Sequence, residues 1–364
     1  MKKAPLYLLS VLIFAGCTPA PEIESDDCEE MVLSYAEHFS VQRYEDYDII
    51  DIDGARYCLT DDTASAPPDC TVIKRTDCIY VAASSAMDLF RGANALDTVK
   101  MTSTEADKWS IPEIRTLVEN EDIVYVGKYN APDFEYLLSE NCGLAVESTM
   151  IYHSPKTEQM LTDIGIPVLT EHSSYESHPL GRLEWVRLYG VLTGHEEEAE
   201  SFFDEKKEIF ESVTTLGETG RSAAFFYLSN GRVNIRKPGD YVSQMIDIAG
   251  GRYIFTADML DVGEDSLSTM NIGMESFYTA AKDADVLIYN STITGSADME
   301  SLLEAAPVLA DLRAVKSGDV WCTEADMFQR TASAAEITQE INMILSGTAD
   351  DEMEFFHRIG KIPD

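Results

Sequence analysis

The cysteine at position 17 stands where a lipid-transferring enzyme of the export pathway would act. It follows an apolar run, residues 4–16, which two lysines precede. A run of about 10–14 apolar residues is typical of a signal peptide, whereas a membrane-spanning helix needs roughly 20. The stretch Phe14-Ala15-Gly16-Cys17 is similar to a bacterial lipobox, with Phe14 where leucine is usual. We expect residues 1–16 to be removed and Cys17 to carry an acyl anchor; the alternative is an ordinary signal peptide in which Cys17 is incidental.

Acylation of Cys17 leaves six cysteines, an even number that can pair completely in an oxidising compartment. They are Cys28, Cys58, Cys70, Cys78, Cys142 and Cys322. The sequence does not fix their connectivity, although Cys58 and Cys70 bracket a proline-containing loop and are the first candidates for a bridge. The alternative is metal binding by thiolates. That reading lacks support because no CxxC spacing occurs.

The chain is strongly acidic, with 65 aspartates and glutamates against 27 lysines and arginines and a formal net charge of -38. Such a field repels nucleic acid and anionic lipid headgroups, so we expect no nucleic-acid partner. We attribute the charge to solubility or to a salty habitat rather than to an acidic binding surface. With 45% hydrophobic residues, the chain is long enough for two cores of ordinary size.

Motifs of common enzymes are missing from the sequence: no G-x-S-x-G, H-E-x-x-H, G-x-G-x-x-G or Walker A pattern occurs. The histidines are scattered, which argues against a binder of bare zinc or manganese ions. They are His38, His153, His172, His178, His195 and His357. His153 and His178 lie near predicted strand ends and are candidates for coordinating haem iron. We expect a protein that is not an enzyme, with a lipid-anchored enzyme and a bare-metal binder as alternatives.

From Cys78 onward, apolar runs alternate with helical patterns, which indicates βα units on a largely parallel sheet. Predicted strands cover 78–82, 97–103, 122–127, 143–148 and 166–170 in a first set, and 222–228, 233–236, 285–290 and 319–324 in a second. Residues 41–52 and 55–61 resemble an antiparallel strand pair. Between the two sets, residues 194–217 have an apolar stripe with helical spacing, acidic residues in the first turn and Gly217 after the end.

These patterns predict an α/β fold of two Rossmann-like lobes joined by a single long α-helix, with a small N-terminal β-rich decoration. The connecting helix would be on the order of 30 Å long and would hold the lobes at a fixed spacing. The expected segments are a signal peptide (1–16), a lipidated N-terminus and linker (17–39), an N-terminal α/β lobe (40–193), the connecting helix (194–217), a C-terminal α/β lobe (218–346) and a tail (347–364).

Several segments together resemble one known family. They are the lipobox at Cys17, LTDIGIPVL (161–169), HPLGRLEWVRLYGVLTGHEEEAE (178–200), GDYVSQMIDIAGGRYIF (239–255), MESFYTAAKDADVLIYN (274–290) and LADLRAVKSGDVW (309–321). Over residues 40–346 the chain is similar to the lipid-anchored substrate-binding proteins of ABC importers for iron-siderophores and cobalamin, the class III periplasmic binding proteins. The resemblance implies a monomer outside the cytoplasmic membrane that captures a ferric siderophore, haem or cobalamin between its lobes. It implies no cofactor beyond this transported ligand, and partners in the permease and ATPase subunits.

The resemblance also implies where the ligand binds, since sites in open α/β sheets lie beyond the carboxyl ends of strands. The candidates carried by such loops are Ser84, Lys128, Tyr129, Tyr152, Tyr227, Arg236, Tyr241, Asn290, Met327, Phe328 and Arg330. Each has a structural alternative: rim packing for the aromatic residues, an ion pair for Arg236, and a helix cap for Ser84 and Asn290. Because only three candidates are basic, a neutral or weakly charged chelate, haem or a corrinoid fits as well as an anionic siderophore.

Two exposed glutamates, one on each lobe, would dock on the permease in this family. The best matches are Glu158 and Glu275, each early in a predicted helix, where the helix dipole also favours an acid. Arg182 and Glu184 are expected to form a structural ion pair near a helix entry.

Overall fold

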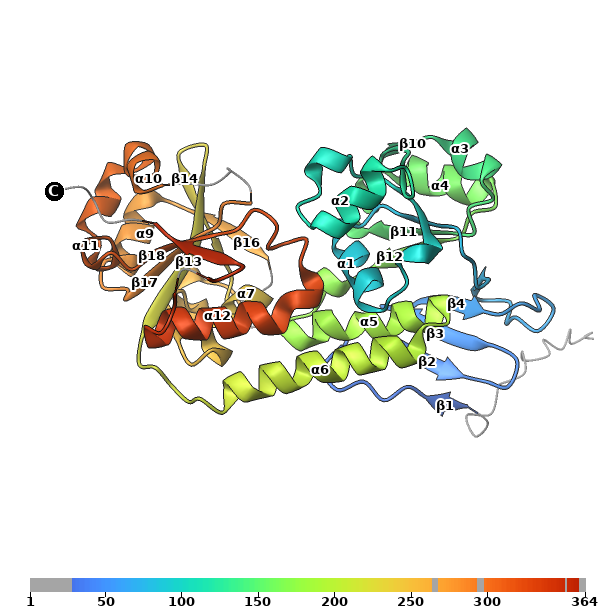
Figure 1. The fold of residues 1–364 in the computed structure, drawn as a ribbon, viewed down its shortest axis with the longest axis horizontal. Coiled ribbons are helices and arrows are strands. Elements are labelled where there is room, and N and C mark those ends of the chain that lie inside the picture. The colour runs from blue at the N-terminus through green and yellow to red at the C-terminus, as the bar shows by residue number, and fades with distance from the viewer. Residues whose placement is uncertain (1–27, 264–267, 293–297, 351, 360–364) are drawn as a thin grey trace, which may run out of the picture.

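The structure is a computed structural model that describes residues 28–263, 268–292, 298–350 and 352–359. The expected signal peptide and the lipidation site at Cys17 lie outside these residues. The chain forms two lobes, with α5 (Pro179–Thr193), α6 (Glu196–Thr214) and α12 (Ala334–Ser346) along the base between them (Figure 1). Among the described residues, no helix is long and apolar enough to cross a membrane.

The N-terminal lobe is built on a five-stranded parallel sheet with the order β12-β11-β6-β7-β8. Its strands are β6 (Ile79–Val81), β7 (Val99–Thr102), β8 (Val124–Tyr125), β11 (Leu144–Ser148) and β12 (Val168–Glu171), and its helices are α1 (Ser84–Gly92), α2 (Pro112–Glu119), α3 (Phe134–Ser139) and α4 (Pro155–Asp163). The central strands are buried on both faces, so they are apolar runs without alternation. Pro112 and Pro155 open α2 and α4, where a missing N–H costs no hydrogen bond.

A second sheet of five strands precedes this lobe and forms the expected β-rich decoration. It consists of β1 (Glu29–Glu30), β2 (Phe39–Arg43), β3 (Asp48–Ile52), β4 (Ala55–Leu59) and β5 (Thr71–Ile73), in that order. β3 and β4 are antiparallel, as predicted, and Asp53 and Gly54 turn the chain between them with positive φ. Residues 41–52 were expected to be one strand of that pair, but they hold part of β2 and all of β3, which pair antiparallel with each other. The sheet also includes β1, which lies in the segment expected to be linker, and β5, which the sequence did not predict.

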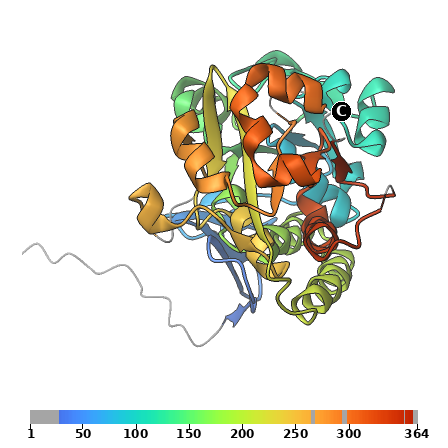
Figure 2. The same ribbon diagram turned by 90° about the vertical axis from the view of Figure 1, so that its left-hand side faces the viewer.

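The C-terminal lobe has a sheet with the order β16-β14-β13-β17-β18-β19, and β15 also pairs with β13. The strands are β13 (Ser222–Ser229), β14 (Arg232–Arg236), β15 (Arg252–Tyr253), β16 (Thr269–Ile272), β17 (Val286–Tyr289), β18 (Val320–Thr323) and β19 (Phe356–Arg358). The helices are α7 (Tyr241–Ile248), α8 (Ala257–Leu260), α9 (Met274–Ala281), α10 (Met299–Ala305), α11 (Arg313–Ser317) and α12. Seen end-on, helices lie on both sides of the long strands (Figure 2). The expected tail contributes β19 to the sheet.

One strand pairing differs from the prediction. Residues 233–236 were expected to begin another βα unit, but β14 pairs antiparallel with β13 as a hairpin. Asn230 and Gly231 form its two-residue turn with φ of 51° and 71°. A tight hairpin turn favours positive φ at both central positions, which Asn and Gly adopt most readily. The local Asn-Gly pair therefore decides the direction of this strand.

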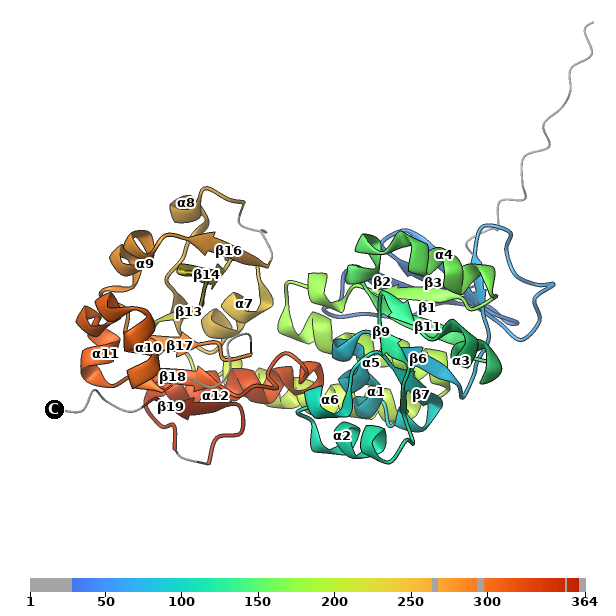
Figure 3. The ribbon, with the colours of Figure 1, turned by 90° about the horizontal axis from the view of Figure 1, so that it is seen from above.

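The connecting helix α6 lies within the range predicted for it. Its stripe buries Ala199, Phe203 and Phe210 against the core of the N-terminal lobe. On another side α6 packs against α12, where Lys206 forms an ion pair with Glu336 at 2.5 Å. Viewed from above, α12 reaches from the C-terminal lobe to α5 and α6 (Figure 3). The lobes are thus held by packed helices and not by one isolated rod.

Direct hydrogen bonds also cross between the lobes. The buried carboxylate of Asp88, in α1, accepts from the backbone N–H of Ala332 at 2.8 Å. The amide of Gln329 donates to the carbonyl of Lys108 at 2.8 Å and accepts from the N–H of Ser110 at 2.9 Å. The segment between β18 and α12 therefore fixes one lobe against the other.

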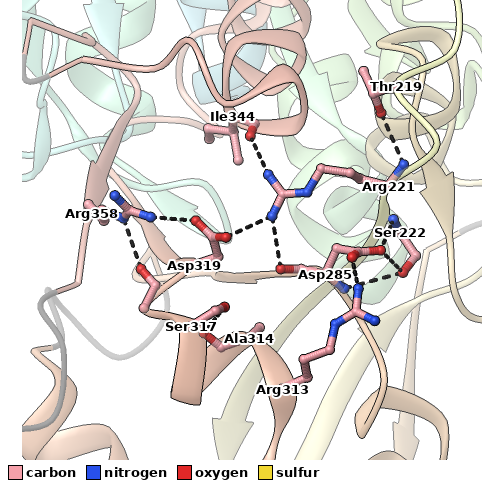
Figure 4. A network of polar contacts seen from close by, with 11 residues as sticks. Thr219, Arg221, Ser222, Asp285, Arg313, Ala314, Ser317, Asp319, Ile344 and Arg358 are labelled. Atoms are coloured by element: carbon pink, nitrogen blue, oxygen red, sulfur yellow. Dashed lines mark hydrogen bonds and ion pairs between the residues drawn. The ribbon is translucent and has the colours of Figure 1, made fainter.

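A network of charged groups ties together the beginnings of the C-terminal-lobe strands (Figure 4). Arg221, before β13, donates to Asp319, before β18, at 2.8 Å and to the carbonyl of Asp285, before β17, at 3.2 Å. Asp285 accepts from the N–H and the hydroxyl of Ser222, both at 2.9 Å, and Arg358 of β19 pairs with Asp319. The network fixes the relative positions of these strands and takes no part in lining the cleft described next.

Candidate ligand-binding cleft

A cleft of about 570 Å³ lies between the two lobes. From the N-terminal lobe and its base helix it is lined by Ser84, Ser85, Ser174, Tyr175 and Arg182; from the C-terminal lobe it is lined by Arg236, Asp240, Tyr241, Ser268 and Phe328. The volume falls within the range of roughly 300–1,000 Å³ that is usual for small-molecule sites. Both lobes therefore contribute to a site large enough for an organic ligand.

The N-terminal wall is made by residues that follow strand ends. Ser85 begins α1 after β6, and its hydroxyl donates to the buried carboxylate of Glu171 at 2.6 Å. The same carboxylate accepts from the N–H of Ser173 at 2.9 Å, which fixes the short 3-10 helix Ser173–Tyr175 after β12. Tyr175 is 41% exposed and gives this wall an aromatic surface.

The C-terminal wall centres on Arg236, at the end of β14. Its Nη1 lies 3.2 Å from Asp240 Oδ2, and its guanidinium carbon lies 4.6 Å from the centre of the Phe328 ring. Burial is the largest influence on the pKa of Arg236 and lowers it, but the charge and hydrogen bond of Asp240 together with Tyr241 and Tyr253 raise the pKa overall. Asp240 Oδ1 also accepts from the N–H of Val242 at 3.0 Å and caps α7. The positive charge of Arg236 is therefore largely balanced.

Arg182, in the first turns of α5, forms the floor of the cleft. Its side chain is almost fully buried, and its guanidinium carbon lies 3.9 Å from the centre of the Tyr241 ring. A cation at this distance over an aromatic face is a cation–π contact. Burial raises the pKa of the Tyr241 phenol, although the two arginines beside it act in the opposite direction.

The expected ion pair between Arg182 and Glu184 does not form. Glu184 instead accepts from the backbone N–H groups of Ser34, Tyr35 and Ala36 at 2.8–3.2 Å and pairs with Arg187 at 3.1 Å. Residues two apart on a helix point in different directions, so one turns to the cleft while the other holds the N-terminal segment. The prediction was wrong because it paired them by nearness in sequence.

Met327 and Arg330 line a small hollow that adjoins the cleft and shares Arg182, Tyr241 and Phe328 with it. Met327 is buried, and Arg330 is held by Asp326 at 2.7 Å. The structure thus brings together six of the residues that the sequence predicted: Ser84, Arg236, Tyr241, Met327, Phe328 and Arg330.

The other five predicted residues do not line the cleft. Lys128 lies exposed in β9 (Gly127–Lys128), followed by Tyr129. The hydroxyl of Tyr152 is hydrogen-bonded to His172 Nε2 at 2.8 Å. Tyr227 is half-buried in β13, and Asn290 is buried, with its side-chain oxygen accepting from the N–H of Thr292 at 3.0 Å.

Sequence reasoning missed the contributions of Arg182, Asp240, Tyr175, Ser174 and Ser268 to the cleft. The one available signal was Arg182 itself, one of three charged residues in a mostly apolar helix, and the sequence alone does not separate it from Arg187. The others depend on how the lobes face each other.

The histidines do not form a metal centre. His178 Nδ1 accepts from the N–H of Leu180 at 3.1 Å, and its ring stacks on Tyr35 with centres 4.8 Å apart. His153 is exposed at the end of the 3-10 helix Thr149–His153. Within the described part of the chain, no three His, Cys, Asp or Glu residues are grouped so as to hold a metal ion.

Comparison with known sequences gives a consistent result. The profile of the periplasmic binding protein family matches residues 84–327. Two uncharacterized lipoproteins of Methanocaldococcus jannaschii are similar, at 25% identity over 61% of this chain and 22% identity over 97% of it. The chain spans about half the length of the first of these relatives (52%) and nearly all of the second (99%).

Solved structures with the same fold include three binding proteins. A periplasmic haem-binding protein from Vibrio cholerae has a TM-score of 0.60 and 17% identity, and covers 74% of this chain and 98% of its own. A petrobactin-binding protein from Bacillus subtilis has a TM-score of 0.60 and 14% identity, with 75% and 93% covered. A vitamin B12-binding protein from Vibrio cholerae has a TM-score of 0.52 and 14% identity, with 74% and 97% covered.

Proposed function

The chain belongs to the periplasmic binding protein family, and on that premise we propose that it is the lipid-anchored substrate-binding component of an ABC importer. Outside the cytoplasmic membrane it captures an iron chelate, either a ferric siderophore or haem, or cobalamin, and delivers it to the permease. The chelate is cargo, and the protein needs no cofactor of its own. It acts as a monomer and has no enzymatic step.

The observation that carries this proposal is the cleft itself. Its walls come from both lobes and combine aromatic rings, hydroxyl groups and guanidinium groups, which suit a large ligand with apolar faces and polar edges. Similarity to lipoproteins and the lipobox at Cys17 support an anchor, and similarity to haem-, petrobactin- and vitamin B12-binding folds supports the class of cargo.

Tryptophan fluorescence tests the proposal on the protein without its signal segment. Trp109, Trp185 and Trp321 are buried, and coloured chelates quench such residues efficiently. Haem, cyanocobalamin and a panel of ferric siderophores are titrated separately. Saturable, submicromolar quenching by one of them supports capture and names the cargo.

A pair of tyrosine variants shows whether the cleft is the binding site. Tyr175→Ala removes a ring that lines the cleft, whereas Tyr129→Ala removes one outside it. We expect the first to weaken binding and the second to leave it unchanged. If no ligand of the panel quenches the fluorescence of the folded protein, or if both variants change the affinity equally, the result would count against capture in this cleft.

A further inference from the structure

The two arginines of the cleft differ in one respect: only Arg236 has a carboxylate partner. Asp240 lies 3.2 Å from Arg236 and is 4% exposed. Arg182 is 7% exposed and appears in none of the ion pairs found among the described residues, and its Nε atom has no hydrogen-bond partner there. The lining of the cleft therefore carries one positive charge that no lining residue balances.

A buried positive charge without a partner of opposite charge is unfavourable. A buried ion loses its hydration, and a partner of opposite charge or several hydrogen bonds must replace it. Tyr241 replaces only part of that hydration: its ring lies 3.9 Å from the guanidinium carbon of Arg182 and its side chain is hydrogen-bonded to the arginine, but it carries no balancing charge. The chain has an excess of 38 acidic charges, yet none of its described carboxylates pairs with this arginine.

The position of Arg182 suits a ligand group better than a structural role. The side chain lines both the main cleft and the small hollow beside it, so it is reached from the ligand space. A guanidinium group that stacks on a ring still has N–H groups free along its own edge. Two of these can donate hydrogen bonds to the two oxygens of a carboxylate. Hydroxyl groups of Ser84 and Ser268 line the same space and can donate to such an anion.

Resting on the capture function proposed above, we infer that the cargo presents a carboxylate to Arg182. The inference narrows the cargo class: a chelate that bears carboxylate groups, such as haem or a carboxylate siderophore, is preferred over a neutral hydroxamate chelate or the amide-bearing corrinoid. Arg182 selects for the anion, while the aromatic residues Tyr175, Tyr241 and Phe328 contact its apolar faces.

The test compares two ligands that differ only in this group, haem and haem dimethyl ester, by fluorescence quenching. The variants are Arg182→Gln, Arg182→Lys and Arg252→Gln, which makes the same charge change at an exposed arginine outside the cleft. We expect Arg182→Gln to weaken binding of the acid about 10- to 100-fold, the range of a lost charge-assisted hydrogen bond, and to leave the ester unchanged. The affinity of Arg182→Lys for haem should lie between that of the unmodified protein and that of Arg182→Gln. The affinity of Arg252→Gln should equal that of the unmodified protein. Circular dichroism verifies that each variant is folded.

A second probe, metal-free citrate, separates this inference from the capture function. Citrate should raise the melting temperature of the unmodified protein but not that of Arg182→Gln. If Arg182→Gln loses as much affinity for haem dimethyl ester as for haem, the anion site is wrong, although the capture function is still supported. Stabilisation by citrate without binding of any chelate would support the anion site and overturn capture. If neither citrate nor any chelate acts on the folded protein, both proposals fail.

Discussion

Arg182 and Tyr241 join the two lobes: the guanidinium carbon from α5 lies 3.9 Å from the centre of a ring that opens α7. Because α5 packs in the core of the N-terminal lobe, this contact forms only when the C-terminal lobe is correctly seated on it. The contact therefore belongs both to the stability of the molecule and to the floor of its cleft.

Replacing the ring tests the contact. We expect Tyr241→Leu to lower the free energy of unfolding by about 1–3 kcal/mol, since the cation–π attraction and part of the packing are lost. Tyr241→Phe keeps the ring face and should stay within about 1 kcal/mol of the unmodified protein. Urea unfolding measures both. A phenylalanine variant as unstable as the leucine variant would show that the hydroxyl, and not the ring, is what matters.

A buried glutamate predicts how stability changes with pH. Glu147, in β11, is fully buried, and neither carboxyl oxygen has a hydrogen-bond partner in the described structure. Burial, reinforced by the nearby charge of Glu158, raises its pKa from 4.5 to about 8. Between pH 4.5 and about pH 8, Glu147 keeps its proton in the folded protein but loses it in the unfolded chain. The free energy of unfolding therefore falls as the pH rises through this range.

Glu147→Gln should remove this loss, because an amide of the same shape does not ionise. Thermal melting at pH 5.5 and at pH 8.5 checks the effect: the unmodified protein loses stability between these two pH values, and the variant loses less. Glu135→Gln, an exposed change in the same lobe, serves as the control and should behave like the unmodified protein. An unchanged slope in the Glu147 variant would show that this carboxyl is already ionised in the fold.

The two glutamates predicted to dock on a permease can be tested separately from ligand binding. Glu275 is exposed in the first turn of α9, and Glu158 is partly exposed in the first turn of α4, on the other lobe. We expect Glu158→Arg and Glu275→Arg to leave the affinity for the cargo unchanged and to lower its uptake by cells at least several-fold, because the family resemblance implies arginines on the permease, which the new positive charges would repel. Glu304→Arg, an exposed charge reversal on α10, is the matched control. Normal uptake by the double variant would locate the docking surface elsewhere.

The cysteines give a prediction about export. Cys78 and Cys142 both pack at one small cluster of the N-terminal lobe, and the carbonyl of Cys78 accepts from the N–H of Gly143 at 2.9 Å. Adjacent strands thus place these two residues close together, and we expect them to form a disulfide in protein secreted to an oxidising compartment. Peptide mapping without reductant should find this bridge, and Cys142→Ser should lower the melting temperature only under non-reducing conditions. Free thiols at both positions in exported protein would contradict it.

Local sequence patterns were sufficient for the buried parallel strands and the connecting helix, but not for β1 or β5. Alternating apolar and helical patterns predicted β6, β11, β12, β17 and β18, because a parallel strand buried on both faces is mostly apolar whatever surrounds it. The stripe of α6 predicted the helix between the lobes for the same kind of reason: periodicity and end signals act within a few residues. The hairpin of β13 and β14 is encoded just as locally, by Asn230 and Gly231. The prediction did not use this turn signal and expected another βα unit.

Local sequence patterns predicted only some of the residues that line the cleft. Placement after a strand end gave Ser84 and Phe328, which line the cleft, but the same rule also gave Lys128 and Tyr152, which lie outside it. Following a strand brings a residue to one edge of its sheet, but the packing of the lobes decides which part of that edge faces the opposite lobe.

By itself the sequence determined the two α/β lobes, the connecting helix and the strongly acidic composition, and it predicts an export signal that lies outside the described residues. Only the tertiary structure decided which side chains contact each other across the two lobes. Arg182 and Glu184 are two positions apart and point to different partners, whereas Arg182 and Tyr241 are 59 positions apart and touch. A contact of this kind depends on the seating of one lobe on the other, which no local pattern records.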